Sequence, residues 1–396
     1  MAAKVTFFPV GNGDMALVTL ADDGTTLLID TNIRAAADDA DDDTPDVAKE
    51  LRSLLRRDKN GRPFVDAFVL SHPDEDHCTG LQKHFHLGPM KEYADDKKPD
   101  AEKRIVIREM WSSAMVFRRA SKQEGFTLCE DAKAWASEAR RRIAANRDKQ
   151  FIGVNEGDRI LIMGEDENGK TDDLSSILIE VDEEFNRLNG QPSEFFSARL
   201  LAPIPKQDDE GEATLSKNNS SVVLNIKIAA NKSVPDGCRF LTGGDADVAI
   251  WELLWDRNKK NPDVFQYDIL QTPHHCSWHT LSYDSWSKKR TKGVVSKDAC
   301  SALSQARQSA FNVASSDPIK DDDNDPPCIG AKWEYEKILG DVSGTFYCTG
   351  EYPTSDEPKP LVFTVTVDGP QAPGKKESGA KVASLITTTR QPHEHG

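Results

Sequence analysis

Short apolar runs separated by Gly, Asn and Asp turns dominate the first seventy residues. Alternation of apolar and polar positions with a period of two is typical of half-buried strands. Gly11-Asn-Gly-Asp14 separates the first two runs, and the fourth run ends directly at Ser71-His72. The pattern predicts an opening β-meander and then a short buried strand, over the ranges 5–10, 15–20, 25–29 and 66–70.

Two stretches carry apolar residues at helical spacing. In the first, Thr44 is the expected N-cap and Pro45 the first helical residue of a helix that buries Val47 and Leu51. The second runs from about 82 to 150 and is rich in charge, so we expect a helical insertion there. Later apolar runs predict further strands and one helix (248–255), the strands lying at 159–163, 176–181, 198–201, 221–228, 239–242 and 266–271.

Strands that alternate with helices predict a mixed α/β fold. We expect residues 1–368 to form one domain that contains the insertion at about 82–150. Residues 369–396 are rich in Gly, Lys, Ser and Thr, which is typical of a flexible tail.

Composition narrows the class of protein. Of the 396 residues, 37% are hydrophobic and 29% are charged, as in soluble globular proteins. The sequence has neither an apolar run of the ~18 residues that cross a membrane nor a signal-peptide pattern, so we expect a cytoplasmic protein with no membrane partner. Seven scattered cysteines argue against a disulfide framework, and the net charge of −16 means that a polyanion would need a local basic patch.

The histidines fall into two clusters, each just after a predicted strand. Outside the last four residues they occupy only positions 72, 77, 84, 86, 274, 275 and 279. Strand ends are where a rigid scaffold presents functional side chains. We interpret His84 and His86 as surface residues of the insertion, and the other histidines near aspartates as candidate metal ligands.

The segment His72-Pro-Asp-Glu-Asp-His77 has the spacing of a two-metal site. In a tight turn, His72 and Asp74 can face one ion while Asp76 and His77 face another. Asp245 follows a strand through Gly243-Gly244, and one carboxylate can bridge two ions. Either His274 or His275 can supply the closing imidazole; we assign His274 to metal and His275 to substrate, because neighbouring side chains point in different directions.

In order along the chain, six motifs resemble those of the ComEC-type branch of the metallo-β-lactamase superfamily. The resemblance spans residues 5–300, and Gly344-Thr-Phe-Tyr-Cys-Thr-Gly350 is similar to the terminal strand of that branch. The motifs are Phe8-Pro-Val-Gly-Asn-Gly-Asp14, Leu27-Leu-Ile-Asp-Thr31, Ser71-His-Pro-Asp-Glu-Asp-His77 with Gly80-Leu81, Asn218-Asn-Ser-Ser-Val-Val-Leu224, Leu241-Thr-Gly-Gly-Asp-Ala246 and Pro273-His-His-Cys-Ser277.

The resemblance implies a four-layer αββα sandwich with two divalent ions at one edge, between the sheets. It assigns six metal ligands: His72, Asp74, Asp76, His77, Asp245 and His274 or His275. It places Asp30 as support for the loop or for a ligand histidine. No histidine lies between 87 and 273, so water, Asn219 or substrate must complete one ion, and an oxygen-rich site accepts Mn²⁺ as well as Zn²⁺. Cys276 stands where the branch usually has glycine and could add a soft ligand.

Two ions would turn a shared water into hydroxide near neutral pH, with Asp76 as the carboxylate that orients it. The resemblance points to DNA as substrate, and the sequence offers two basic runs: Arg140-Arg-Arg142, and Lys288, Lys289, Arg290 and Lys292. The first hypothesis is a phosphodiesterase or nuclease that works with partner proteins of a DNA-processing or defence system. The alternatives are a small-molecule ester, lactone or phosphoester hydrolase, and a non-catalytic binding or regulatory protein.

Overall fold

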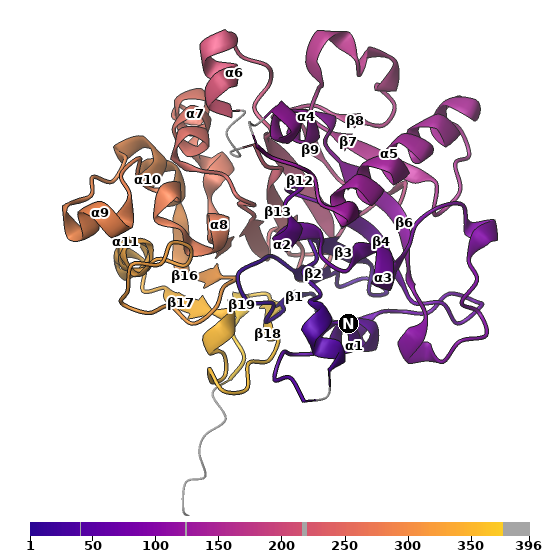
Figure 1. Ribbon diagram of the computed structural model, residues 1–396, viewed down its shortest axis with the longest axis horizontal. Coiled ribbons are helices and arrows are strands. Elements are labelled where there is room, and N and C mark those ends of the chain that lie inside the picture. Colours follow the sequence, from indigo (N-terminus) through magenta and orange to yellow (C-terminus); the bar gives the residue numbers. More distant parts are fainter. Residues whose placement is uncertain (40, 123–124, 216–219, 375–396) are drawn as a thin grey trace, which may run out of the picture.

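The computed structural model describes residues 1–396 except 40, 123–124, 216–219 and 375–396 (Figure 1). Within the described part of the chain, the strands form two large sheets and one small hairpin. The first sheet contains β1 (Lys4–Phe7), β2 (Ala16–Thr19), β3 (Thr26–Ile29), β4 (Phe64–Val69), β5 (Phe85–His86), β6 (Ile105–Ser112), β7 (Arg159–Met163), β8 (Leu178–Ile179), β18 (Leu361–Thr366) and β19 (Gly369–Gln371). The second contains β9 (Glu184–Phe185), β12 (Phe196–Ala202), β13 (Val223–Ile228), β14 (Cys238–Leu241), β15 (Tyr267–Gln271), β16 (Ala306–Ala314) and β17 (Thr345–Cys348); β10 (Arg187–Leu188) and β11 (Gln191–Pro192) form the hairpin.

Each sheet is antiparallel in one part and parallel in the other. In the first sheet β1, β2 and β3 are antiparallel neighbours, whereas β3, β4, β6, β7 and β8 run parallel. In the second, β12, β13 and β14 are antiparallel and β14 to β17 are parallel. Parallel strands bring their carboxyl ends to one edge, so loops after β3, β4, β14 and β15 can converge there.

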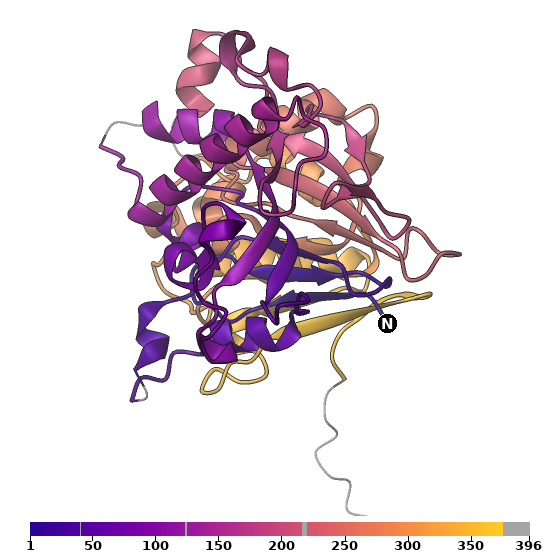
Figure 2. The ribbon, with the colours of Figure 1, turned by 90° about the vertical axis from the view of Figure 1, so that its right-hand side faces the viewer.

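Three apolar clusters show how the layers stack (Figures 1 and 2). The first lies between the sheets and joins Phe7 of β1 to Phe240 of β14. The second packs the other face of the second sheet against helices through Trp251 and Tyr335, and the third does the same for the first sheet through Trp135. The protein is therefore an α/β sandwich with helices on the outer faces of the two sheets.

The helices are mostly short. The helix predicted after the acidic loop is present as α1, but Asp46 is its N-cap, since its carboxylate accepts from Lys49 N at 2.9 Å; the prediction of Thr44 was wrong. The α-helices are α1 (Val47–Leu54), α2 (Glu75–Cys78), α3 (Leu81–His84), α4 (Ala114–Lys122), α5 (Glu130–Asp148), α6 (Asp209–Leu215), α7 (Val248–Asn258), α8 (Pro273–Cys276), α9 (Trp286–Lys289), α10 (Lys297–Leu303) and α11 (Ile329–Asp341).

The predicted helical insertion over residues 82–150 needs correction. Its first half contributes β5 and β6, and β6 pairs with both β4 and β7 inside the first sheet. The charged residues around β6 hid a strand whose own side chains are almost all buried. The prediction of His84 and His86 as surface residues was wrong, because both side chains are buried. In the interior, His84 accepts from Arg52 at 3.1 Å and His86 contacts the Pro89 carbonyl.

At the C-terminal end of the described chain, residues 369–371 of the expected tail form β19, which pairs with β18. Residues 375–396 lie outside the described part. In the described residues, no helix combines the length and the apolar character needed to cross a membrane.

Candidate metal centre

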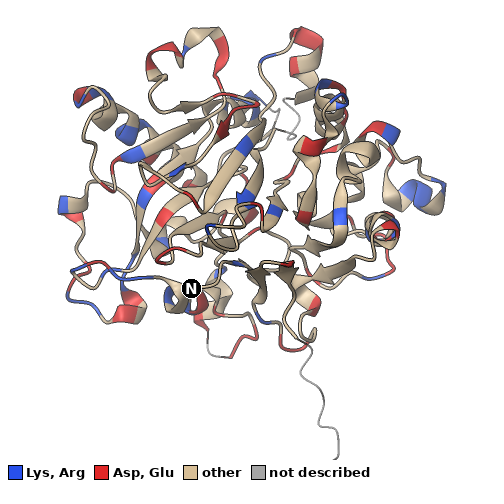
Figure 3. Cartoon of the chain, turned by 180° about the vertical axis from the view of Figure 1, so that it is seen from behind, with Lys and Arg blue, Asp and Glu red and all other residues tan. Residues whose placement is uncertain are grey.

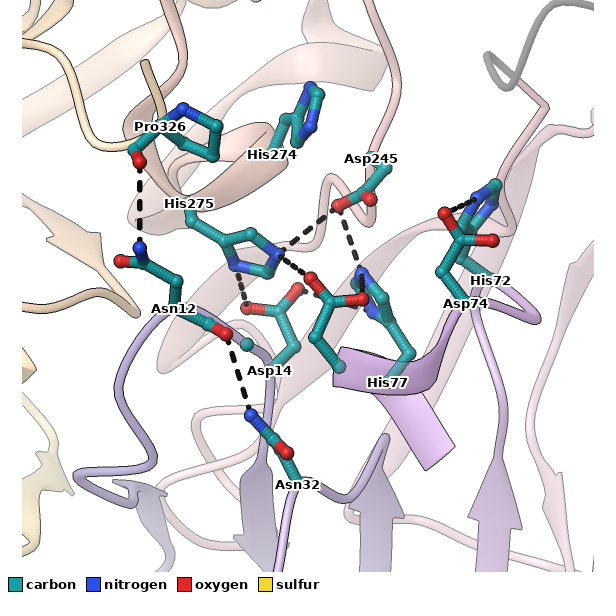
Figure 4. Close-up of polar contacts among 12 residues, drawn as sticks. Asn12, Asp14, Asn32, His72, Asp74, His77, Asp245, His274, His275 and Pro326 are labelled. Carbon is teal, nitrogen blue, oxygen red and sulfur yellow. Dashed lines mark hydrogen bonds and ion pairs between the residues drawn. The ribbon is translucent and has the colours of Figure 1, made fainter. Parts of the chain in front are cut away.

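The loop that follows β4 carries the predicted ligand motif at the edge where the two sheets meet (Figure 4). Its backbone is tied to two neighbouring loops: Thr31 N donates to the His77 carbonyl at 2.9 Å, and Asp14 N donates to the Asp76 carbonyl at 3.1 Å. These bonds fix the motif from both sides. Asp76 and His77 thus project from a rigid turn, the short helix α2.

His77 is held between two buried carboxylates. Its Nδ1 lies 3.0 Å from Asp30 Oδ2 and its Nε2 lies 2.9 Å from Asp245 Oδ1. Asp30 also accepts from the backbone N and hydroxyl of Ser71, at 2.7 and 2.5 Å. Asp30 therefore orients the imidazole from behind and leaves Nε2 directed at Asp245, which is the geometry that a supporting carboxylate gives a ligand histidine.

Asp245 belongs to two groups of candidate ligands. One group is Asp76, His77, Asp245 and His275, and the other is His72, Asp74 and Asp245; within each group, the ligand atoms lie within 4.8 Å of one another. Asp245 is 3% exposed, and its backbone N donates to Ser221 Oγ at 3.0 Å. The structure thus brings four of the predicted ligands, His72, Asp74, Asp76 and His77, together around the shared carboxylate of Asp245.

The two adjacent histidines of α8 exchange the positions expected for them. His275 Nε2 lies 3.1 Å from Asp76 Oδ2 and 3.5 Å from Asp245 Oδ1, whereas His274 Nδ1 lies 3.1 Å from Asp247 Oδ1 and its ring turns away from the cluster in Figure 4. In this geometry His275, and not His274, lies among the candidate metal ligands, and the roles assigned to the two histidines stay predictions. His274, His275 and Cys276 all have positive φ, a tight left-handed turn that reverses the expected directions.

Asp14 joins the site although it was not among the predicted ligands. It is 1% exposed, and its carboxylate lies 3.4 Å from His275 Nδ1 and 3.8 Å from His77 Nδ1. Its loop is anchored from the far side, because Ser315 Oγ donates to the Gly13 carbonyl at 2.6 Å. The signal was present in the sequence as an aspartate at the end of a glycine turn that follows a buried strand.

Other predicted residues lie beside the cluster or outside the description. Asn219 falls in the part of the chain that is not described. Its neighbour Ser220 presents a carbonyl 3.1 Å from His72 Nδ1, so His72 also has an oriented ring. Cys276 is fully buried, and its thiol lies 3.9 Å from the Cys328 carbonyl.

Burial lowers the pKa of each imidazole, but the carboxylates outweigh it. Asp74 raises the pKa of His72 to about 9, and Asp14 with Asp245 raises that of His275 to about 10. The pKa of His77 is raised well above its ordinary value by Asp245 and Asp30. Burial likewise opposes ionisation of Asp245, yet His77 and its neighbours hold the pKa of that carboxyl well below the ordinary value. The protonated form of each of these histidines and the ionised form of Asp245 are therefore stabilised by neighbouring groups of opposite charge.

The donor set fits divalent cations. Five carboxylates (Asp14, Asp30, Asp74, Asp76 and Asp245) surround three imidazoles (His72, His77 and His275). When the imidazoles are neutral, the buried carboxylates of Asp14, Asp30 and Asp245 meet no cationic side chain among the described residues, and buried uncompensated charge is costly. Divalent ions supply the missing charge, and imidazole with carboxylate is a ligand set that suits Zn²⁺ or Mn²⁺.

A cavity of about 710 Å³ opens beside the cluster. Asp74 and Asp76 form one part of its wall, and Arg34 and Cys129 lie elsewhere on it. A cavity of this size accommodates a drug-sized molecule. The cluster therefore faces a space in which a small substrate can meet Asp76.

The basic residues after α8 are only partly available. Arg290 pairs with Asp321 and Asp323 and stacks over Trp286 at 4.8 Å, so it ties α9 to an acidic loop. Lys288, Lys289 and Lys292 are exposed. On the inserted helix, Arg142 is buried against Glu138. Figure 3 shows acidic and basic residues interspersed over the molecule.

No family model matches the sequence, and no curated protein matches it. Among solved structures, the isothiocyanate hydrolase from Delia radicum gut bacteria is similar at a TM-score of 0.36 and 12% identity, over 90% of this chain and 98% of that chain.

Proposed function

We propose that the protein is a hydrolase that uses two divalent metal ions, Zn²⁺ or Mn²⁺. The observation that carries the proposal is the position of Asp245, which completes one ligand group with His72 and Asp74 and another with Asp76, His77 and His275. A shared carboxylate between two ligand groups is the arrangement of two-metal hydrolytic sites. A lone structural ion would need only one of the groups.

The proposal includes membership of the metallo-β-lactamase superfamily and its ComEC-type branch. Two features support it: the collinear motifs, and helices on the outer faces of two packed sheets with the ligands at their shared edge. The full αββα assignment is part of this proposal.

The chain's own residues would divide the work. Metal ions held by these residues would supply Lewis acidity that activates water and polarises the electrophilic group of the substrate. Asp76 is partly exposed to the cavity and accepts from His275, so its carboxylate can orient the attacking water and hold its proton. Asp30 keeps His77 in place, and Asp14 does the same for His275.

The cavity favours a small ester, lactone or phosphoester as substrate. Arg34 is the cationic side chain on its wall, and it can receive an anionic group of the substrate. Long DNA is the second candidate. It has support from the exposed Lys288, Lys289 and Lys292, whereas Arg290 is already paired with carboxylates. A nuclease role with partner proteins of a defence system rests on these lysines.

The metal part is tested with Asp245→Asn. The variant should lose metal from both groups, and with it hydrolysis, because both share the carboxylate. Asp236→Asn is the matched control: Asp236 pairs with Arg239 and Arg307, outside both ligand groups. Equal metal content and activity in the Asp245→Asn variant and in the parent would refute the proposal.

The substrate class is tested with zinc- or manganese-loaded protein on p-nitrophenyl acetate, bis(p-nitrophenyl) phosphate, plasmid DNA, single-stranded DNA and RNA. A small substrate turned over without cleavage of nucleic acid supports the first candidate. If DNA is cleaved, reversing the three lysines to glutamate should weaken that cleavage and its salt dependence while sparing the small phosphodiester. A metal-loaded protein inactive on the whole panel would favour the non-catalytic alternative.

A further inference from the structure

Two cysteines face each other at the wall of the metal-site cavity. Cys78 is the last residue of α2, Cys129 is the N-cap of α5, and their sulfur atoms lie 3.4 Å apart. The segments that carry them are held together by Asp131, whose carboxylate accepts from Gly80 N at 2.8 Å and Gln82 N at 3.0 Å. The two thiols are therefore neighbours in a fixed setting.

The two thiols differ in environment. Cys129 is half-buried and lines the cavity, so a small oxidant can reach it. Its sulfur accepts from Ala132 N at 3.4 Å, and a helix N-terminus favours a thiolate there. Hydrogen bonding with Cys78 and from the backbone of α5 lowers the pKa of Cys129 to about 7, and the same thiol–thiol contact raises the pKa of Cys78 well above its ordinary value. Cys78 is buried behind it and contacts the Asp74 carbonyl at 3.2 Å.

The remaining cysteines lack this combination. Cys238, Cys276, Cys328 and Cys348 are buried, and burial raises the pKa of each thiol. Cys300 is half-buried like Cys129, but its sulfur contacts the Ser304 hydroxyl at 3.6 Å and not a second thiol. Cys300 is thus the matched control for exposure without a resolving partner.

We propose that Cys129 and Cys78 form a peroxide-reactive pair that closes to a disulfide. The Cys129 thiolate attacks one oxygen of hydrogen peroxide, which breaks the O–O bond, gives the sulfenic acid and releases hydroxide. The Cys78 sulfur then attacks the Cys129 sulfur. An S–S bond forms, and the sulfenic oxygen leaves as water with the thiol proton.

The cross-link lies beside the proposed metal site and joins one element that carries proposed ligands to the cavity wall. The sulfur atoms must approach from 3.4 Å to about 2 Å, a small movement for two loop-supported residues. The disulfide then ties α2, which carries Asp76 and His77, to the start of α5 at the cavity wall. The chemistry of the thiols does not depend on hydrolysis, so it can be tested whether or not the proposed function holds.

The test treats the full-length protein with hydrogen peroxide near pH 7 and follows each thiol by alkylation and peptide mass spectrometry. Cys129 should react at least about tenfold faster than Cys300. The product should be a Cys78–Cys129 cross-linked peptide that dithiothreitol reverses. In the Cys78→Ser variant, the disulfide should be absent and a 1,3-diketone probe should trap sulfenic acid at Cys129.

Two results would overturn the proposal. The first is a Cys129 that reacts no faster than Cys300. The second is a Cys129 that proceeds to sulfinic acid in the parent without the cross-linked peptide. Cys300→Ser should leave the reaction unchanged. Cys78→Ala is a second variant that removes the resolving thiol. Circular dichroism of each variant shows whether a missing disulfide reflects the loss of that thiol or the loss of the fold.

Discussion

Two clusters of charged side chains differ: one, around Glu138, lies on the first sheet and α5, and the other, around His77, lies where loops of both sheets meet. Around Glu138, every charge meets its complement: Arg141 and Arg142 each bond its carboxylate at 2.7 Å, and Gly88 N donates to it at 2.9 Å. Around His77, five carboxylates crowd three imidazoles. The first cluster is complete as it stands, whereas in the second the buried carboxylates Asp14, Asp30 and Asp245 meet only imidazoles among the described charged side chains.

The difference separates a structural role from a functional one. Arg142 also donates to the carbonyls of Arg159 in β7 and Ile107 in β6, so the Glu138 cluster links α5 to two strands. A buried ion pair that satisfies itself holds elements together. Buried carboxylates that meet only imidazoles point instead to a cation that arrives from solution.

The largest effect on stability is expected at the complete cluster. Glu138→Ala leaves Arg142, 1% exposed, without its counter-ion, and breaking a buried pair costs about 3–5 kcal/mol. Chemical denaturation should show this loss in the free energy of unfolding, while metal content per chain stays that of the parent. A loss below about 1 kcal/mol, the range of surface pairs, would contradict the assignment.

The next largest effect is expected on hydrolytic activity. Asp76→Ala removes a proposed ligand and the carboxylate that orients water, so hydrolysis of the best substrate should fall by more than tenfold, about 1.4 kcal/mol of transition-state stabilisation. The free energy of unfolding should change little, because Asp76 is partly exposed. The neighbouring exposed Glu75, changed to Ala, is the control. Retention of activity within tenfold would remove Asp76 from the mechanism.

A smaller effect is expected in how the stability of the cluster around His77 depends on pH. The folded-state pKa values of His72 and His275 are raised, to about 9 and about 10. Their contribution to stability is therefore fully present below the unfolded-state pKa of about 6.5 and is lost as pH rises through the folded values. The melting temperature of metal-free protein should fall over this window. Bound metal needs neutral imidazoles, so loading should reduce the fall, and equal profiles with and without metal would contradict this.

Sequence reasoning reached the ligand types and their loops because spacing and strand ends are visible in one dimension. The segment His72 to His77 and Asp245 could be predicted in this way. The choice between His274 and His275 could not, since it depends on a left-handed turn at three non-glycine residues. The contribution of Asp14 could not be predicted either, because its loop is anchored by a hydrogen bond between Ser315 and Gly13, which are 302 residues apart in the sequence.

Prediction of the fold was limited in the same way, by contacts between residues far apart in the sequence. The ten predicted strands lie near their observed bounds, because each is an apolar run between turn residues, whereas β16 and β18 were not predicted. β6 was missed because the charged helices around it dominated the pattern, and its pairing with β4 and β7 is a long-range fact. The Arg290 side chain was expected to meet phosphate, yet its partners Asp321 and Asp323 lie more than thirty residues away.

The carboxylates and imidazoles around Asp245 are proposed to form a two-metal site. Its most direct test is anomalous scattering from crystals of protein supplied with Zn²⁺ or Mn²⁺, together with elemental analysis of the same sample. The account predicts two ions: one on His72, Asp74 and Asp245, and the other on Asp76, His77, Asp245 and His275. A metal-supplied crystal with no anomalous peak at either group would contradict it.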